Sequence, residues 1–243
     1  MVNNVASLKQ GKQIIDLLLS LNHDQAQQWI ENGDLLKLIP AAINLKDIDR
    51  QWLIDLLEGK NDLKKFGRIL AEWRHFWSHY GIKADFSGIR IPDPREEFDR
   101  LLVIPEGLTE GRMIDIFRKS FSVNNRLGLV GIENDRVAEK SYAIWVRNRQ
   151  NADEELSGLS ADDLKEKGLK GITLLERLVY ELKYFKETKQ HLDAESFWTL
   201  CSGSRGHNGF VAGVYWMQAG AFVIQNLSPS SAEDKLCGRE VVA

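Results

Sequence analysis

Hydrophobic residues recur at helical spacing through the first eighty positions of the chain. From Ser7 to Tyr80 they fall three and four residues apart, in short segments that stop at Pro40, Gly59 and Gly81. Proline removes a backbone donor and glycine commonly follows the last turn of a helix, so these residues mark helix ends. The segments share no fixed period, so we do not expect a solenoid. The pattern predicts an N-terminal helical module over residues 1–85.

The pattern changes in a charged stretch that contains two prolines. Pro92 and Pro94 disfavour helix in the residues before them, and we predict a linker over residues 86–98. The segment "LLVIPEG" that follows is short and apolar, as a buried strand is, and "TEGRMIDIFRKSF" places its apolar side chains on one helical face. We interpret the next stretch, "VNNRLGLVGIENDR", as a loop.

A strand and two capped helices are predicted in the middle of the chain. The segment Tyr142–Val146 alternates with the period of a strand. Ser160 with Asp163, and Thr173 with Glu176, place a hydroxyl at a helix start and a carboxylate three residues on, where both can bind the free amides of a first turn. The second helix carries a continuous apolar stripe, which indicates that it packs on an apolar surface.

The last 48 residues differ in composition from the rest of the chain, because they contain only three cationic and three acidic residues. Short candidate strands, "WTLCS", "GVYW", "AFVIQN" and "REVVA", alternate with turn-rich pieces such as "GSRGHNG" and "LSPSSAEDK". Together the patterns predict an α+β protein, with an N-terminal helical bundle followed by a domain with small antiparallel sheets over residues 99–243.

Composition narrows the function classes. The chain has 32 Lys and Arg against 35 Asp and Glu, a formal net charge of −3, so nucleic acid is not an expected partner. The first residues lack a signal-peptide pattern, and the apolar runs are far shorter than a membrane span, so we expect a cytoplasmic protein without a membrane partner. Two cysteines, Cys201 and Cys237, are too few for a disulfide framework or a zinc quartet.

Two constellations have the residue types of catalytic or metal sites. His75 and His79 lie four apart on one predicted helix face, as a metal-binding pair does, yet the surrounding aromatic residues fit a core helix equally well. Cys201, His191 and Asp193 have the types of a nucleophile, a base and an orienting acid, while "TKQHLD" fits a helix end equally well. In "GSRGHNG", backbone amides beside Arg205 could bind an anion, but a hairpin turn is the favoured interpretation.

The C-terminal segments "ITLLERLVYELKYFKETKQHLD", "WTLCSGSR", "VYW" and "AFVIQNLSPSSAEDKLCGRE" resemble those of bacterial hypothetical proteins from uncultured lineages. The resemblance covers most of the chain from Leu101 onward. The closing layout also resembles the C-type-lectin-like domains that formylglycine-generating enzymes share with the variable proteins of diversity-generating retroelements. Residues 201–205 stand where that terminal region opens, and residues 237–242 stand where its last strand closes it.

This resemblance implies that the strand "SYAIWVRN" pairs with the terminal "REVVA", and that the last segment forms a ligand-binding face on a fixed scaffold. Tyrosine and small polar residues suit such a face, because they give contact area at low entropic cost and adaptable hydrogen bonds. The residues expected to face outward are His207, Asn208, Phe210, Tyr215, Met217, Gln218, Gln225, Asn226, Ser228, Ser230 and Ser231. The residues expected to form the scaffold are Trp198, Leu200, Val214, Trp216, Phe222, Ile224, Leu236 and Val241.

The resemblance does not extend to oxidase chemistry, because Cys201 and Cys237 lack the close spacing of the copper-binding cysteines in the formylglycine-generating branch. We therefore expect a non-catalytic recognition protein, without a cofactor, whose terminal face binds a macromolecule, in the first place a protein. Two alternatives stay open. One is an enzyme with a Cys201-centred site or a His75/His79 metal site, and the other is a scaffold that assembles through the helical module.

Overall fold

A computed structural model describes residues 61–125, 131–194, 197–207, 209–217 and 220–243 of the chain. The chain divides into two compact units, residues 1–87 and 88–243. Most of the predicted helical module, residues 1–60, lies outside the described residues. Within the described residues, every helix is too short or too polar to cross a membrane.

The described part of the first unit contains one long helix, α5 (Asn61–Ser78). Its aromatic face is buried, with Trp73 and Trp77 at most 2% exposed. After the helix the amide of Ile82 donates to the carbonyl of Trp77, while Gly81 adopts a φ of +70°. This is the usual way for a glycine to close a helix, and it confirms the predicted end at Gly81.

The second unit is built around a five-stranded sheet. Its strands are β2 (Ser122–Asn125), β5 (Trp198–Cys201), β7 (Val211–Trp216), β8 (Ala221–Leu227) and β9 (Leu236–Gly238). They lie in the order β2-β8-β7-β5-β9; β2 runs parallel to β8 and β9 parallel to β5, while the central strands are antiparallel. Two smaller antiparallel pairs are β1 (Arg100–Ile104) with β4 (Tyr142–Val146), and β3 (Glu133–Asn134) with β6 (Ser204–Arg205).

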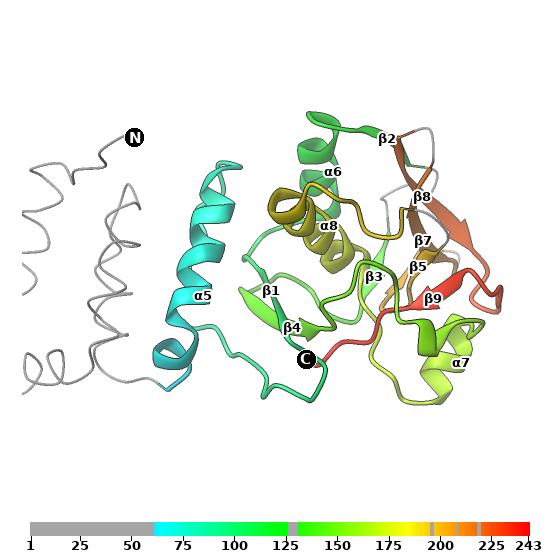
Figure 1. Ribbon diagram of the computed structural model, residues 1–243, viewed down its shortest axis with the longest axis horizontal. Coiled ribbons are helices and arrows are strands. Elements are labelled where there is room, and N and C mark those ends of the chain that lie inside the picture. Colours follow the sequence, from blue (N-terminus) through cyan, green and yellow to red (C-terminus); the bar gives the residue numbers. More distant parts are fainter. Residues whose placement is uncertain (1–60, 126–130, 195–196, 208, 218–219) are drawn as a thin grey trace, which may run out of the picture. The chain divides into compact units, whose positions relative to one another are not determined.

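Helices α6 (Glu110–Arg118) and α8 (Leu174–Thr188) pack against one another and lie on the same side of the five-stranded sheet (Figure 1). The short elements η1 (Glu154–Leu156) and α7 (Ala161–Glu166) precede α8 in the chain. Both predicted capping boxes are confirmed, at Ser160 for α7 and at Thr173 for α8. Thr173 is fully buried, so its hydroxyl and the Glu176 carboxylate provide partners for amides that water does not reach.

The last residues of the chain return to β4. The amide of Trp145 donates to the carbonyl of Val242 (2.9 Å), and the amide of Val242 donates to the carbonyl of Trp145 (3.0 Å). The pairing predicted between "SYAIWVRN" and "REVVA" is therefore confirmed at this position. Two details of the prediction are wrong. The final named strand, β9, begins earlier, at Leu236, and the predicted loop after α6 contains most of β2 and all of β3.

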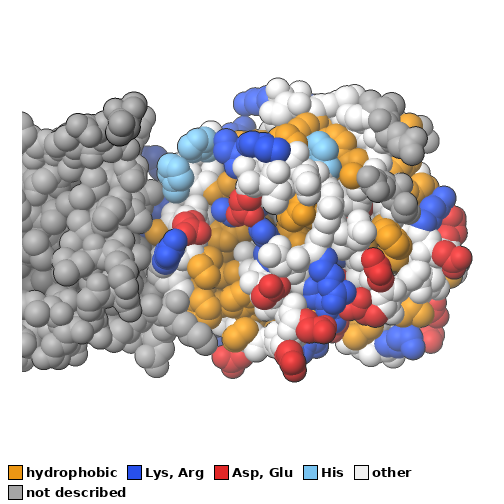
Figure 2. All heavy atoms as spheres, viewed as in Figure 1, with side chains coloured by type: hydrophobic (Ala, Val, Ile, Leu, Met, Phe, Trp, Pro, Cys, Tyr) orange, Lys and Arg blue, Asp and Glu red, His pale blue; other side chains and the backbone are white. Residues whose placement is uncertain are grey.

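The segment predicted as a linker is packed rather than free from Gly88 onward, because it belongs to the second unit. The Trp145 indole donates to the carbonyl of Pro92 at 2.8 Å, and Arg95 pairs with Glu240 at 2.6 Å. Phe98, predicted as the end of the linker, is 2% exposed. The prediction relied on charge density, but Arg95 and Glu97 of this stretch pair with charged residues of the second unit. On the face in view, acidic and basic side chains are interspersed (Figure 2).

Candidate binding face

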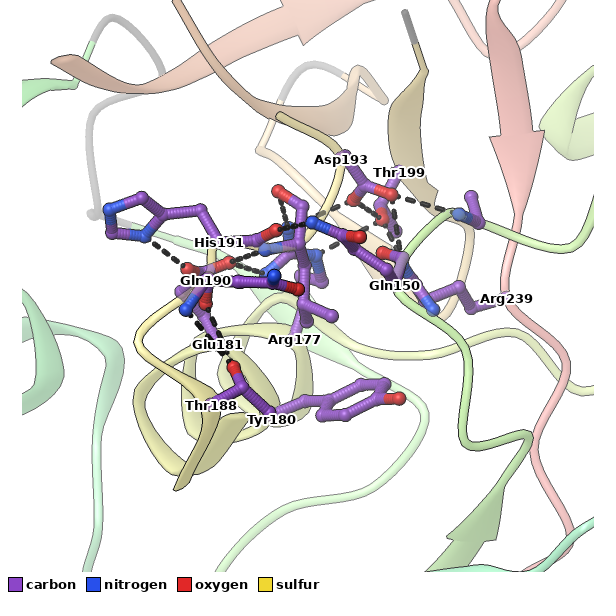
Figure 3. A network of polar contacts seen from close by, with 12 residues as sticks. Gln150, Arg177, Tyr180, Glu181, Thr188, Gln190, His191, Asp193, Thr199 and Arg239 are labelled. Atoms are coloured by element: carbon purple, nitrogen blue, oxygen red, sulfur yellow. Dashed lines mark hydrogen bonds and ion pairs between the residues drawn. The ribbon is translucent and has the colours of Figure 1, made fainter. Parts of the chain in front are cut away.

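A buried network of charged side chains holds the sheet, α8 and the C-terminal segment together (Figure 3). Arg177 from α8 and Arg239 from the C-terminal segment both contact Asp193, at 2.9 Å and 2.8 Å. The Nε atoms of both guanidinium groups donate to the hydroxyl of Thr199 in β5, and this hydroxyl donates to Asp193. All four side chains are at most 1% exposed, so each charge depends on its partners inside the protein.

The same network fixes backbone segments as well as side chains. Arg239 donates to the carbonyls of Arg149 (3.2 Å) and Gln150 (2.7 Å), and Asp193 accepts from the amide of Ala152 (2.8 Å). These bonds join the loop after β4 to the segment that follows β9, and the contact of Asp193 with Thr199 connects both to β5.

Electrostatics in this network keep Asp193 ionised. Burial by itself raises the pKa of the Asp193 carboxyl group, but the charges of Arg239 and Arg177 outweigh burial and hold the pKa below its ordinary value. The pKa of Arg177 is raised, because its attraction to Asp193 and Glu181 overcomes the effect of burial on the guanidinium. The network is therefore a stable arrangement of charges and not a reservoir of exchangeable protons.

The structure does not join Cys201, His191 and Asp193 into a relay. His191 Nδ1 contacts Glu181 at 2.9 Å and its ring stacks on Trp216, while the Asp193 carboxylate is occupied by the two arginines and Thr199. Cys201 is fully buried, and this burial raises the pKa of its thiol to about 12. A thiol of this kind is almost wholly protonated at neutral pH, so the geometry disfavours the Cys201 nucleophile of the enzyme alternative.

The "GSRGHNG" segment forms a turn, as the favoured interpretation had it. Gly206 donates its amide to the carbonyl of Phe210 (2.7 Å), and Gly209 donates to the carbonyl of Gly206 (2.8 Å). The guanidinium of Arg205 donates to the carbonyls of Ser202 and Ser204. Because both amides and the guanidinium are engaged within the turn, the anion-binding interpretation gains no support from this geometry.

The sheet face opposite α6 and α8 carries a stacked aromatic pair. Successive side chains of a strand alternate between faces, so Tyr215 in β7 lies on the face opposite to that of Trp216. The indole of Trp198 and the phenol of Tyr215 stack with ring centroids 4.2 Å apart at an interplanar angle of 9°. The ammonium group of Lys235 lies 4.1 Å from the centroid of the Trp198 ring. Trp198 and Tyr215 are each partly exposed, and Lys235 is exposed.

The registers place Gln225 beside this pair. Gln225 lies opposite Gly213, and Tyr215 lies opposite Val223, on the same face of β7 and β8. We call the surface of Trp198, Tyr215, Gln225 and Lys235 the outer platform. The other end of this face is covered, because Leu156, Ala161 and Leu164 of η1 and α7 pack there on Leu200 and Val211.

The structure brings together some of the residues predicted to face outward and separates others. Tyr215 and Gln225 belong to the outer platform, with Met217 (42% exposed) in the adjoining β7–β8 hairpin. Opposite, where β7 begins and β8 ends, lie His207, Phe210, Asn226, Ser228, Ser230 and Ser231, of which Ser231 is half-buried and the rest are exposed. Tyr215 and Phe210 lie toward opposite ends of β7, about 17 Å apart, whereas Gln225 and Asn226 are consecutive in β8 and point to opposite faces of the sheet. Asn208 and Gln218 lie outside the described residues.

The residues predicted as scaffold are buried, with one exception. Trp198 is partly exposed and forms the centre of the outer platform, and Lys235 of the platform was not among the predicted binding residues. Trp198 lies two residues before Leu200, a spacing that places both on one face. The sequence shows this two-residue spacing, but it does not show which part of the sheet face α7 covers.

The described residues contain no group of three or more His, Cys, Asp or Glu side chains with the arrangement of a metal site. Comparisons with protein-family models, curated proteins and solved structures find no match for this chain.

Proposed function

We propose that this chain is a non-catalytic recognition protein, and that its second unit is a C-type-lectin-like module whose outer platform binds a protein ligand. The observation that carries the proposal is the partly exposed Trp198–Tyr215 stack on a sheet that buried charges hold in place. Tryptophan and tyrosine are enriched among the residues that dominate binding energy at protein interfaces.

The composition around the platform favours a protein over other macromolecules. Lys235 over the indole of Trp198 supplies a cation, and the Gln225 side chain supplies both a donor and an acceptor. A net charge of −3 and the scarcity of cations in the last 48 residues disfavour a polyanion such as nucleic acid. A platform of two aromatic rings with adaptable polar neighbours resembles the anchor residues of protein-binding surfaces.

The lectin-like assignment is supported by the order of elements and by the closure of the unit. From β4 onward, one strand, two capped helices and a run of short strands follow one another, and Val242 then pairs with Trp145 in β4. This is the arrangement that the resemblance to C-type-lectin-like variable proteins implies. Under this proposal the buried network is scaffold, and the outer platform and the loops at the sheet ends are the variable surface.

Recognition can be tested with a library of displayed random peptides panned on the purified full chain. Binders are sorted against a variant that carries both Trp198→Ala and Tyr215→Ala, with the single variant Val137→Ser as a control. Val137 is 54% exposed and lies outside the platform. The proposal predicts peptides that bind the wild type and the control but not the double variant, and peptides that bind all three proteins equally contradict it.

Diversification of the terminal face has a separate test in the neighbouring DNA. The resemblance predicts a near-copy of the segment that encodes residues 198–239, differing mainly at adenines, beside a reverse transcriptase gene. A neighbourhood without this copy contradicts diversification. That result does not bear on recognition through the outer platform, which the peptide experiment tests separately.

A further inference from the structure

The last turn of α5 is a well-closed helix end that carries two histidines. The amide of Gly81 donates to the carbonyl of Ser78, and the amide of Ile82 donates to the carbonyl of Trp77, both at 3.1 Å. This pair of bonds, with Gly81 in the left-handed region, is a standard helix ending, and it keeps the backbone helical as far as His79. His75 and His79 therefore lie one helical turn apart on a defined backbone.

Both histidines belong to the solvent-facing side of this turn. Their imidazole centroids are 5.1 Å apart, with an interplanar angle of 75°, and both side chains are exposed. Histidine side chains gather at the surface over the end of α5 in Figure 2. The buried side of the turn is formed by Trp73, Phe76 and Trp77, whose rings pack on one another with centroids 4.9–6.0 Å apart. The aromatic packing thus involves the other side of the helix and leaves both imidazoles accessible.

We propose that His75 and His79 form a two-imidazole binding site for a divalent transition-metal ion, with Cu²⁺ preferred. Neutral imidazole nitrogen is a common ligand for such ions, and residues four apart on a helix are close enough to bind one ion together. Cu²⁺ binds nitrogen ligands more tightly than the other first-row divalent ions. The proposal concerns the first unit and is independent of the outer platform.

The electrostatics of the helix end favour a cation there. The partial negative charge of the carbonyls at a helix C-terminus attracts positive charge within the last turn. Glu72, three residues before His75, is engaged with Arg68 at 3.2 Å, and the described residues form no group of three metal-binding side chains. In this proposal the described residues supply two ligands, and water completes the coordination, as suits an ion that exchanges readily.

The site can be tested by titrating the full chain, without an affinity tag, with Cu²⁺ at about pH 7.5, where neutral imidazole is available for binding. Calorimetry gives the stoichiometry and the dissociation constant, and electron paramagnetic resonance reports nitrogen ligands. Loss of an outer-shell partner alone weakens metal binding by roughly 10- to 100-fold, so His75→Ala and His79→Ala should each weaken it by at least about tenfold. The two variants should unfold at the wild-type temperature, because both side chains are exposed.

Glu72→Gln is the matched control, since it changes an exposed neighbour on the same helix that is not a ligand in this proposal. The proposal predicts wild-type affinity for this variant. Absence of saturable binding overturns the proposal, as does an affinity that is unchanged in both histidine variants. A tenfold loss in Glu72→Gln would overturn the two-ligand assignment.

Discussion

Trp145 in β4 and Val242 near the end of the chain exchange two backbone hydrogen bonds, of 2.9 and 3.0 Å. These bonds connect β4, the partner strand of β1, to the last residues of the chain, so they anchor the C-terminal segment. They also lie beside Glu240, which contacts both Arg95 and Arg147. The pairing is therefore one of the contacts on which the stability of the whole unit depends.

Val242→Pro should destabilise the protein, because proline removes the donor to Trp145 and leaves its carbonyl without that partner. A buried polar group without a partner costs about 1–3 kcal/mol, which we expect as the loss in unfolding free energy in denaturant titrations. Val242→Ala keeps the amide and serves as the control. Equal losses in the two variants would show that the backbone pairing contributes little.

Arg239→Met should be strongly destabilising, because it leaves the buried Asp193 with one guanidinium in place of two. Removing one partner of a buried ion pair costs about 3–5 kcal/mol, measurable as a lowered denaturant midpoint. Arg118→Ala is the comparison, since Arg118 is exposed and pairs loosely with Asp115 at 3.8 Å. It should change stability by about 0.5 kcal/mol or less, and a similar loss in both variants would contradict the role of the network.

Acid should weaken the fold through Asp193. The pKa of this carboxyl group is lower in the folded protein than in the unfolded chain, because the attraction of Arg239 and Arg177 exceeds the opposing effect of burial. Its stabilising contribution is therefore complete above the unfolded pKa, about 3.9, and is lost as the pH falls below it toward the folded value. Unfolding free energy should drop with pH in this range, and more steeply than in Asp193→Asn. Parallel slopes for the two proteins would refute this assignment.

Cys201 should be unreactive in the folded protein. Its side chain is fully buried, and burial raises the pKa of the thiol to about 12, so very little thiolate exists at about pH 8. Ellman's reagent should label this residue only after unfolding in guanidinium chloride, with Cys201→Ala identifying the signal. Rapid labelling of Cys201 in the native protein would restore the nucleophile hypothesis.

The sequence allowed prediction of those elements that local chemistry determines. Two helix starts were predicted from capping boxes, because this motif is contained within four residues. The pairs are Thr173 with Glu176 and Ser160 with Asp163. The alternation in Tyr142–Val146 likewise predicted β4. Strand bounds were harder to predict where the pattern was short: β9 at Leu236–Gly238 lies between the predicted turn-rich segment "LSPSSAEDK" and the predicted strand "REVVA".

Contacts between distant segments could not be predicted in the same way. The buried network joins Arg177, Asp193, Thr199 and Arg239, and no local pattern distinguishes these residues from charged surface residues. The stack of Trp198 on Tyr215 depends on the register between β5 and β7, and its exposure depends on how far α7 extends over the sheet. Long-range packing determined both features, and the predicted binding face accordingly omitted its central tryptophan.

The most direct test of the account is the affinity of a peptide selected on the full chain, measured for the wild type, Trp198→Ala, Tyr215→Ala and Val137→Ser. Truncation of an interface anchor typically costs about 2 kcal/mol or more of binding free energy, which corresponds to a roughly 30-fold larger dissociation constant. We predict this loss for Trp198→Ala and for Tyr215→Ala, with Val137→Ser within about twofold of the wild type. Unchanged binding in both aromatic variants, with their folds intact, would contradict the outer platform as the recognition site.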